Sequence, residues 1–408
     1  MSGPVNQVRE ILSATRLEHV RYAIRDIAVI AERLAAEGKT ILPLNIGDPL
    51  QFDFRTPPHL FEAVVKAMAD GKNGYAPSLG VEEAREAVRS AAHLRGFRNI
   101  QDVFITQGVS EAVDVCLSAL VNPGENVLLP SPEYPLYSAV LARLGAQPNS
   151  YALDEGSNWE PDVEHLAGRI FTGTRAIVLI NPNNPTGAIY SRRTLERIAE
   201  LARQHNLVII ADEIYDKLML DGDEHVSIAT LAPDVPVVTF NGLSKAYLVP
   251  GWRVGWGIVT GDASAVRPYI EGIHKLLRSR ISANHAAQYA VRPALERPQD
   301  HLAGILRRMR ARRDMTYEWA NSAPGMSCVK PRGAFYAFPK LDITESDEEF
   351  VRQLLMEKHV LAVHGSGFGQ APGTRHMRIV FLPDEHTLGR AFESITAFLL
   401  ERRRAQET

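Results

Sequence analysis

The stretch FNGLSKAYLVPGWRVGW, residues 240–256, carries the strongest signal in this chain. Lys245 follows the β-like run 236–240 and a short loop of small residues, and Arg253 lies further along the same loop region. A lysine at the end of a buried strand is placed to form a Schiff base with an aldehyde, and a nearby arginine is placed to hold an anion. Together they indicate a covalently bound, phosphorylated aldehyde, pyridoxal 5'-phosphate, although a lone lysine is ordinarily a solvated surface charge.

Outside this stretch, nearly continuous apolar runs alternate with amphipathic segments. Such runs are typical of strands buried on both faces of a parallel sheet. Between them lie segments such as 191–206, whose apolar positions follow the helical spacing. This alternation predicts an α/β fold with a mostly parallel sheet covered by helices. The predicted strands are 103–105, 126–129, 176–180, 207–211 and 237–240.

A polar or Gly- and Pro-rich loop follows each of these strands. Open α/β sheets bind their ligands at the carboxyl ends of the strands, so we expect these loops to surround one site. The loops read TQGVSEA, PSPEYPLY, NPNNPTG, DEIYDK and NGLSK in chain order.

The two ends of the chain have a different pattern. We expect helices at 301–320, 346–358 and 384–401, with strands at 334–338 and 377–381. This pattern predicts a smaller α+β domain, which the opening segment joins through a helix at 19–37 and the sequence LPLNIGDP. The predicted division is an N-terminal segment at 1–50, a large cofactor-binding domain at 51–300 and a small domain at 301–408.

Composition narrows the class of protein. The chain has 408 residues with 45% hydrophobic and 23% charged residues, which is ordinary for a globular enzyme. A net charge of −3 argues against nucleic-acid and anionic-membrane partners. No apolar run approaches the roughly 18 residues of a membrane span, and no secretion signal is recognisable. Cys116 and Cys328 show no metal-ligand spacing, and we expect a cytoplasmic protein without a metal site.

A series of motifs extends this picture over almost the whole chain, from about residue 17 to about residue 400. In order they are NIGDP, GY(x)4G, PEYPLY, NPNNPTG, ADEIYDK, GLSK(x)7R and RIVFLP. The chain thereby resembles the class I/II aminotransferases of pyridoxal-phosphate fold type I, and within them the bacterial alanine (glutamate–pyruvate) branch. The resemblance implies transfer of an amino group from an L-amino acid to a 2-oxo acid. It also implies a homodimer with active sites shared between subunits.

The resemblance assigns the central chemistry to Lys245 and Asp212. Lys245 would form the internal aldimine and, once released, would move the proton during catalysis. Asp212, directly after a buried strand, would pair with the pyridine nitrogen and keep it protonated. The alternative for Asp212 is a helix N-cap. Tyr215 and Asn184 would contact the phenolic oxygen of the cofactor, and Tyr134 would stack on its ring.

The phosphate would be held by donors from several loops. Val109 and Ser110 open a predicted helix at 110–121, whose amides and dipole favour an anion. Arg253 would pair with the phosphate as a fork, and Ser244 would add a hydroxyl. Tyr75 would reach the phosphate from the neighbouring subunit. Many relatives have a serine three residues before the lysine, where this chain has Gly242.

Arg378 is the predicted substrate residue. It lies inside an apolar strand, where an unpaired charge is costly, and a guanidinium–carboxylate pair would satisfy it. The alternative is a structural salt bridge. Gly47 in NIGDP would let the backbone approach the substrate closely, and Asn184 would contribute to the same site.

The expected reaction is L-alanine + 2-oxoglutarate = pyruvate + L-glutamate. Tyr134 favours this branch because aspartate-specific relatives often have tryptophan there. The alternatives are aspartate, aromatic or broad-specificity transamination, and a pyridoxal-phosphate β-lyase or decarboxylase. Arg278 or Arg280 could contact a side-chain carboxylate from the partner subunit. A binding domain of a DNA-binding regulator is disfavoured because the stretch before residue 45 is too short for the added module.

Overall fold

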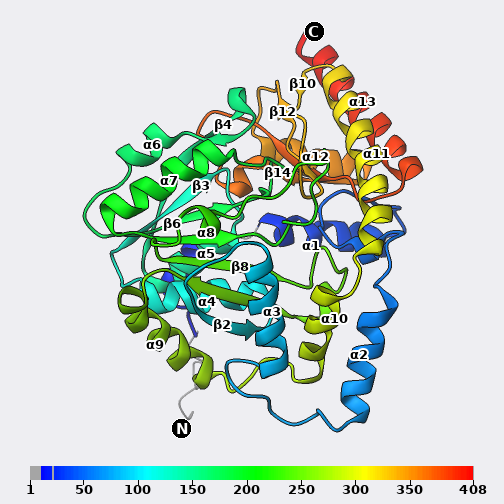
Figure 1. The fold of residues 1–408 in the computed structure, drawn as a ribbon. Helices are drawn as coiled ribbons and strands as arrows, with labels where there is room; N and C mark the ends of the chain where they lie inside the picture. Colours follow the sequence, from blue (N-terminus) through cyan, green and yellow to red (C-terminus); the bar gives the residue numbers. More distant parts are fainter. Residues whose placement is uncertain (1–10, 21–22, 408) are drawn as a thin grey trace, which may run out of the picture.

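A central eight-stranded sheet organises the protein, whose computed structural model describes residues 11–20 and 23–407 (Figure 1). The strand order across the sheet is β2-β9-β8-β7-β6-β3-β4-β5. The strands are β2 (Ile100–Thr106), β3 (Asn126–Ser131), β4 (Gln147–Asp154), β5 (Glu160–Pro161), β6 (Thr174–Ile180), β7 (Val208–Asp212), β8 (Val237–Gly242) and β9 (Gly255–Thr260).

The sheet is mostly parallel, as predicted. Strands β4, β3, β6, β7 and β8 pair in parallel, and β9 runs antiparallel between β8 and β2. Because β9 is reversed with respect to both neighbours, β2 and β8 point the same way. The five strands predicted for the large domain therefore present their carboxyl ends at one edge.

Strand β9 was not identified from the sequence, and its glycines explain why. Gly255 and Gly257 weaken the strand signal of GWGIVT. In the fold both positions lie against other backbone or ring atoms. A Cβ on Gly255 would lie 2.6 Å from the Val109 nitrogen, and one on Gly257 would collide with the Phe104 ring. The close approach of β2 and α4 therefore requires the glycines.

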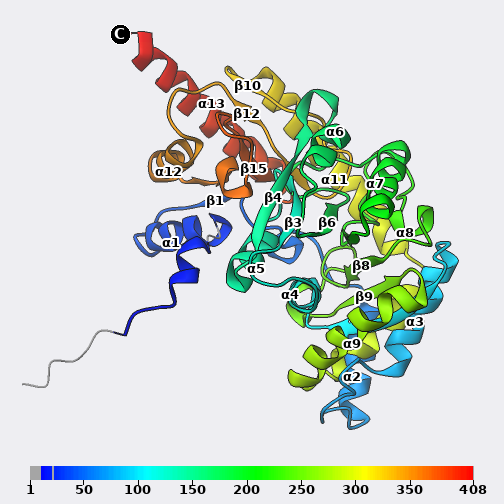
Figure 2. The same ribbon diagram turned by 90° about the vertical axis from the view of Figure 1, so that its left-hand side faces the viewer.

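Both faces of the sheet are buried, and the side chains of β6 alternate between them. Ile177 and Leu179 join one hydrophobic cluster, while Ala176, Val178 and Ile180 join another. This period of two is the pleat of the strand. Figure 2 shows helices on both sides of the sheet. One face packs on α4 (Val109–Leu120), α5 (Leu136–Leu144) and α9 (Ala263–Ser279). The other cluster includes residues of α2 (Pro58–Ala69), α3 (Glu82–Leu94), α6 (Val163–Gly168), α7 (Arg192–His205), α8 (Ile228–Leu231) and α10 (Val291–Glu296).

A second core is built from both ends of the chain. It combines residues 27–54 with residues 305–399 and a few side chains from 214–220 and 248. Its helices are α1 (Ala23–Ala36), α11 (Asp300–Ser322), α12 (Asp347–Lys358) and α13 (Glu385–Glu407). Strand β1 (Leu42–Pro43) pairs with β13 (Val360–Leu361), which joins the two ends directly. The predicted helices at the C-terminal end are confirmed; of the helix expected at 19–37, residues 21–22 lie outside the described residues.

Smaller sheets lie outside the central one, and one of them contains the strand that carries Arg378. Strand β15 (Met377–Val380) pairs antiparallel with β11 (Tyr336–Ala337) and β14 (Val363–His364). A further pair joins β10 (Met326–Ser327) to β12 (Lys340–Leu341). The strand predicted at 334–338 is shorter than expected, and the one at 377–381 is confirmed. Among the described residues, no helix is both long enough and apolar enough to span a membrane.

Two neighbouring buried arginines of α11 fasten different loops, and Arg312 holds the one that precedes α2. Arg312 donates from Nη1 and Nη2 to the Asp53 carboxylate at 2.8 and 2.7 Å, and from Nη1 to the Leu382 carbonyl at 2.6 Å. Arg313 next to it donates to the Asp221 carboxylate and to the Pro331 carbonyl. Both buried charges are satisfied in this way, and Arg312 connects α11 with the segment that follows NIGDP.

Candidate active site

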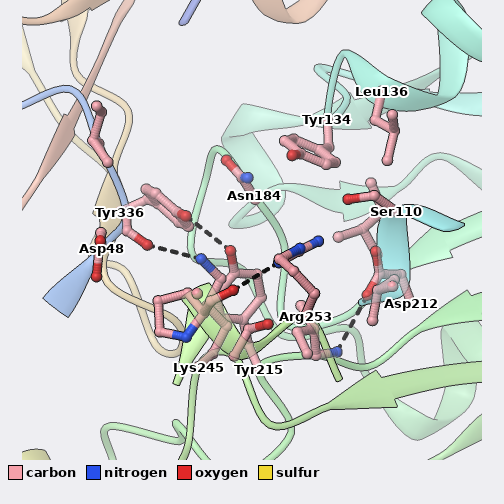
Figure 3. Close-up of a pocket in the computed structure, with 18 of the residues that line it drawn as sticks. Asp48, Ser110, Tyr134, Leu136, Asn184, Asp212, Tyr215, Lys245, Arg253 and Tyr336 are labelled. Atoms are coloured by element: carbon pink, nitrogen blue, oxygen red, sulfur yellow. Dashed lines mark hydrogen bonds between the residues drawn. The ribbon is translucent and has the colours of Figure 1, made fainter. Parts of the chain in front are cut away.

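A pocket of about 580 Å³ lies at the carboxyl edge of the sheet, beside β15 (Figure 3). All the site residues predicted from the sequence line it except Tyr75. Tyr75 is 82% exposed in the single chain. The lining residues among the predicted ones are Gly47, Val109, Ser110, Tyr134, Asn184, Asp212, Tyr215, Ser244, Lys245, Arg253 and Arg378. In the described part of the chain, no group of three or more His, Cys, Asp or Glu side chains could hold a metal ion.

Lys245 lies in the loop that follows β8, and its amine points into the pocket (Figure 3). Its Nζ donates to the Gly47 carbonyl at 2.8 Å and lies 5.6 Å from the centre of the Phe335 ring. Burial lowers the pKa of Lys245 to about 8, and the Asp48 carboxylate opposes part of that shift. A larger fraction of the amine is therefore neutral, and nucleophilic, than in an exposed lysine.

The structure supplies a physical reason for Gly242, the departure from the family pattern. A Cβ there would lie 2.7 Å from the Val254 carbonyl oxygen and 3.0 Å from the Gly255 Cα. Strand β9 packs so closely on this residue that a serine would force the backbone apart. Ser244, two residues further on, is buried and lines the pocket, so it is the hydroxyl available near the lysine.

Asp212 is the last residue of β7 and is almost completely buried. It accepts hydrogen bonds from the Tyr137 hydroxyl at 3.1 Å and from the Ile214 amide at 3.2 Å. Burial raises the pKa of Asp212 to about 6, and the two donors oppose the shift. The carboxylate therefore remains largely ionised at neutral pH, as a partner of a pyridinium nitrogen must. Tyr137 was not singled out from the sequence, although it closes the PEYPLY motif.

The two consecutive asparagines of NPNNPTG have different environments. Asn183 is fully buried, and its side-chain oxygen accepts from the Thr186 amide and hydroxyl at 3.1 and 2.8 Å. It therefore holds the turn. Asn184 faces the pocket, and its Oδ1 accepts from Nη1 of Arg378 at 3.1 Å. An ordinary turn explains the first asparagine but not the second.

Arg378 lies in the middle of β15 and is 1% exposed. It donates to Asn184 and to the Asn45 carbonyl. Its guanidinium lies between two rings, 4.6 Å from the centre of Tyr336 and 4.7 Å from that of Phe368. The Asn184 side chain, the Asn45 carbonyl and the two rings hold the guanidinium in place. This arrangement positions a planar, charged donor for an incoming carboxylate.

The opposite end of the pocket is suited to a phosphate. Gly108 caps α4 with a φ of +75°, and a Cβ there would collide with the guanidinium of Arg253. Arg253 itself has a left-handed backbone, and its Nη1 donates to the Pro250 carbonyl at 2.9 Å. The arginine is thus held against the amino end of α4, where Val109 and Ser110 begin the helix. Helix amides, a dipole and a guanidinium in one place fit a phosphate group.

Arg278 and Arg280, the two arginines that could contact a side-chain carboxylate of the substrate, have different surroundings in the single chain. Arg280 donates from Nε to Glu111 at 3.0 Å, and from its other nitrogens to the Ser78 and Ile105 carbonyls. It therefore braces the beginning of α4. Arg278 is exposed near the end of α9. A substrate contact by either residue stays a prediction.

Sequence reasoning missed Tyr336 and Asp48, which also line the pocket. Tyr336 belongs to β11, which pairs with the strand of Arg378, and its hydroxyl lies 2.8 Å from that of Tyr215. A Cβ on Gly47 would collide with this hydroxyl. The available signal was the tyrosine in the apolar run AFYAF, since a tyrosine in such a run needs a polar partner when buried.

Glu133 is a buried carboxyl group at the junction of two loops near the pocket. Its amide donates to the Phe368 carbonyl at 2.7 Å, and its Oε2 has no hydrogen-bond partner among the described residues. Burial raises the pKa of Glu133 from 4.5 to about 8, with the Ser138 hydroxyl opposing. The side chain is therefore largely neutral at pH 7.

Replacing Glu133 with glutamine is expected to make the protein more stable at alkaline pH. The folded protein holds this proton up to about pH 8, while the unfolded chain releases it near 4.5. This group therefore lowers wild-type stability as pH rises through that window, by up to about 1.4 kcal/mol per pH unit. Glutamine cannot ionise, so Glu133→Gln should lose that dependence. Urea unfolding midpoints across this range would reveal it, and parallel curves for the two proteins would contradict it.

Comparison with known proteins places this pocket in a family context. The sequence profile described as "Aminotransferase class I and II" matches residues 39–395. The chain is 42% identical over 398 residues to a glutamate-pyruvate aminotransferase AlaA of Haemophilus influenzae, covering 95% of this chain and 98% of that protein. It is 41% identical over 405 residues to an alanine aminotransferase of Mycobacterium bovis, covering 97% and 94%. The solved alanine aminotransferase from Pyrococcus furiosus is 40% identical, with a TM-score of 0.92 and coverage of 96% and 100%.

Proposed function

Because the chain belongs to the aminotransferase class I and II family, we propose that it transfers the amino group of L-alanine to 2-oxoglutarate, giving pyruvate and L-glutamate. It is a transaminase of pyridoxal-phosphate fold type I, and its cofactor is pyridoxal 5'-phosphate. The relatives named for alanine or glutamate–pyruvate transamination support the choice of substrates. The observation that carries the proposal is that Lys245, Asp212 and Arg378 line one and the same pocket.

The proposed chemical role of each residue follows from its position in the pocket. When bound, pyridoxal phosphate supplies an aldehyde that takes up the amino group and a ring that withdraws electrons. Lys245 provides the amine that holds the aldehyde and the base that moves the substrate proton. Asp212 stays ionised and holds the ring nitrogen protonated.

Further residues of the pocket fix the two ends of the ligand. Ser110, Ser244, Arg253 and the amide of Val109 hold the phosphate. Tyr134 lies on the ring, and Tyr215 and Asn184 contact its phenolic oxygen. Arg378 binds the α-carboxylate of the amino acid and of the oxo acid alike, and Gly47 lets the protein backbone approach the substrate closely. Both half-reactions then use one carboxylate site.

The domain division at 1–50, 51–300 and 301–408 belongs to the same proposal. It is supported by the separate hydrophobic clusters, one of which draws on both ends of the described chain. In this arrangement Arg378 comes from the smaller domain and Lys245 from the larger one. The substrate is then bound between them. We also propose that the protein is located in the cytoplasm.

A panel of amino donors tests the substrate assignment. L-alanine, L-aspartate and L-tyrosine would each be supplied with 2-oxoglutarate, and L-glutamate formation would be followed. We expect kcat/KM for L-alanine to exceed that for L-aspartate by about tenfold or more. Faster turnover of aspartate would overturn the alanine assignment while leaving transamination intact. Ammonia release without consumption of the oxo acid would instead indicate a β-lyase.

We propose that the active enzyme is a homodimer in which Tyr75 reaches the phosphate of the partner's site. Helix α2 supports this proposal, because Phe61, Val65 and Met68 form an exposed apolar stripe at helical spacing on it. Figure 1 shows α2 at the periphery of the fold, and the exposed Tyr75 follows it in the chain. Exposing such a stripe to water is unfavourable in a monomer, and a second copy of the chain would cover it.

Phe61→Asp is therefore expected to convert the dimer to a monomer and to weaken cofactor binding about tenfold, through loss of Tyr75. Analytical ultracentrifugation and a cofactor titration measure the two effects. Phe171→Asp is the matched control, because Phe171 is also exposed but follows α6, which lies far from α2 in Figures 1 and 2. A dimeric Phe61→Asp protein would contradict the role of α2.

A further inference from the structure

We propose that Tyr336 is a positioning residue that joins the substrate end of the pocket to its cofactor end. The inference rests on the proposed function, since it assumes that Arg378 binds a carboxylate and that Tyr215 donates to the cofactor's phenolic oxygen. Tyr336 is 2% exposed and lines the pocket from β11 (Figure 3). It touches one residue of each end.

The hydroxyl of Tyr336 contacts the cofactor end. It lies 2.8 Å from the Tyr215 hydroxyl in a buried hydrogen bond, and the two rings meet edge to face at 5.7 Å. Burial raises the pKa of Tyr215 well above its usual range, so the phenol stays protonated at neutral pH. A tyrosine hydroxyl has one proton to donate. If Tyr215 donates its proton to the cofactor, Tyr336 must be the donor in the hydrogen bond between the two tyrosines.

That direction has a consequence for the cofactor. A hydroxyl that accepts a hydrogen bond becomes a stronger donor through its own proton. Tyr336 therefore strengthens the donation from Tyr215 and favours the ionised form of the phenolic oxygen. The pH at which the bound cofactor changes its absorption is held lower as a result.

The ring of Tyr336 contacts the substrate end. The Arg378 guanidinium lies 4.6 Å from its centre and 4.7 Å from the centre of Phe368, so it is held between two aromatic faces. Cation–π attraction and packing restrict the guanidinium plane. A guanidinium held in this way loses less entropy when it pairs with a carboxylate. The ring should thus affect substrate affinity, and the hydroxyl should affect the cofactor.

Two substitutions separate these effects. Tyr336→Phe keeps the ring over Arg378 but removes the hydroxyl, and Tyr336→Leu removes both. In the holoenzyme, Tyr336→Phe should raise the midpoint of the absorption titration by about 0.5 pH unit, with KM for both substrates within about threefold of wild type. Tyr336→Leu should add an increase in KM of about tenfold for L-alanine and 2-oxoglutarate. If Tyr336→Leu does not fold, Phe368→Leu tests the other face of the same sandwich.

A double-mutant cycle with Tyr215→Phe decides whether the hydroxyl acts through Tyr215. Tyr215→Phe should raise the titration midpoint further than Tyr336→Phe does, and adding Tyr336→Phe to it should then change nothing. Equal, additive shifts would overturn the inference, and so would an unchanged midpoint in Tyr336→Phe. Tyr151→Phe is the control, because it removes a buried hydroxyl that donates to the Val178 carbonyl at 2.8 Å outside the pocket. It should leave the midpoint unchanged.

The wild-type protein separates failure of this inference from failure of the proposed function. A wild type that neither binds pyridoxal phosphate nor transaminates would overturn the function and the inference with it. A fully active wild type with an additive double mutant would overturn only the role of Tyr336.

Discussion

Lys245→Ala is expected to lower kcat for transamination by at least about 10⁴-fold while leaving the cofactor able to bind reversibly. In the proposed mechanism the lysine supplies both the covalent attachment and the proton-transfer base, and none of the other residues lining the pocket is a lysine. Asp212, Arg253 and the amino end of α4 remain in place, so the ring and the phosphate keep their partners. The measurements are steady-state turnover and the absorption spectrum before and after dialysis.

The matched control for this substitution is Lys275→Ala, which removes an exposed lysine of α9. It should retain wild-type kcat and covalent cofactor attachment. Because burial lowers the pKa of Lys245, its removal also takes away a desolvated amine, and the variant should fold. Normal turnover in folded Lys245→Ala protein would refute the assignment of the lysine.

Arg378→Leu is expected to lower kcat/KM for both the amino donor and the oxo acid by about 10³-fold. The loss corresponds to the charge-assisted pair with the α-carboxylate, and it should appear for every substrate that carries one. Cofactor binding should persist, because Arg378 lies at the substrate end of the pocket. Arg378→Lys should not restore activity. An ammonium can neither form a bidentate pair with a carboxylate nor stack between Tyr336 and Phe368.

A substrate without a carboxylate sharpens this test. The half-reaction with a simple alkylamine should be slow in the wild type and equally slow in Arg378→Leu. Arg375→Leu is the control within the same segment, because its Nε donates to the Glu345 carbonyl away from the pocket. An equal loss of activity with the alkylamine would mean that Arg378 has a structural role instead.

The central sheet was predictable because its strands are buried on both faces. A strand such as β6 needs apolar residues at every position, so the run at 176–180 stands out in the sequence. Strand β9 does not have such an apolar run because it contains Gly255 and Gly257. These glycines are needed because a Cβ at either position would collide with neighbouring atoms. Strand β4, with its partly exposed residues at the side of the sheet, also lacks a continuous apolar run.

The site was predictable to the extent that it follows the strands. Asp212, Asn184 and Lys245 each come after a buried strand, and parallel pairing brings those ends together. Tyr137 and Tyr336 were missed because each is an aromatic residue in an apolar segment, where packing alone would account for it. Their hydroxyls acquire partners only through contacts between segments 75 and 121 residues apart.

The amino-acid sequence by itself determined the α/β fold, the carboxyl-edge loops and the residue types that we propose hold pyridoxal phosphate. These follow from local periodicity and from motifs that each occupy a few consecutive residues. Only the tertiary structure decided that Asn183 holds a turn while Asn184 holds Arg378, and that β9 excludes a side chain at Gly242. It also decided the lowered pKa of Lys245 and the raised pKa of Asp212. Burial and close packing depend on which distant segments meet, and that information exists only in the folded chain.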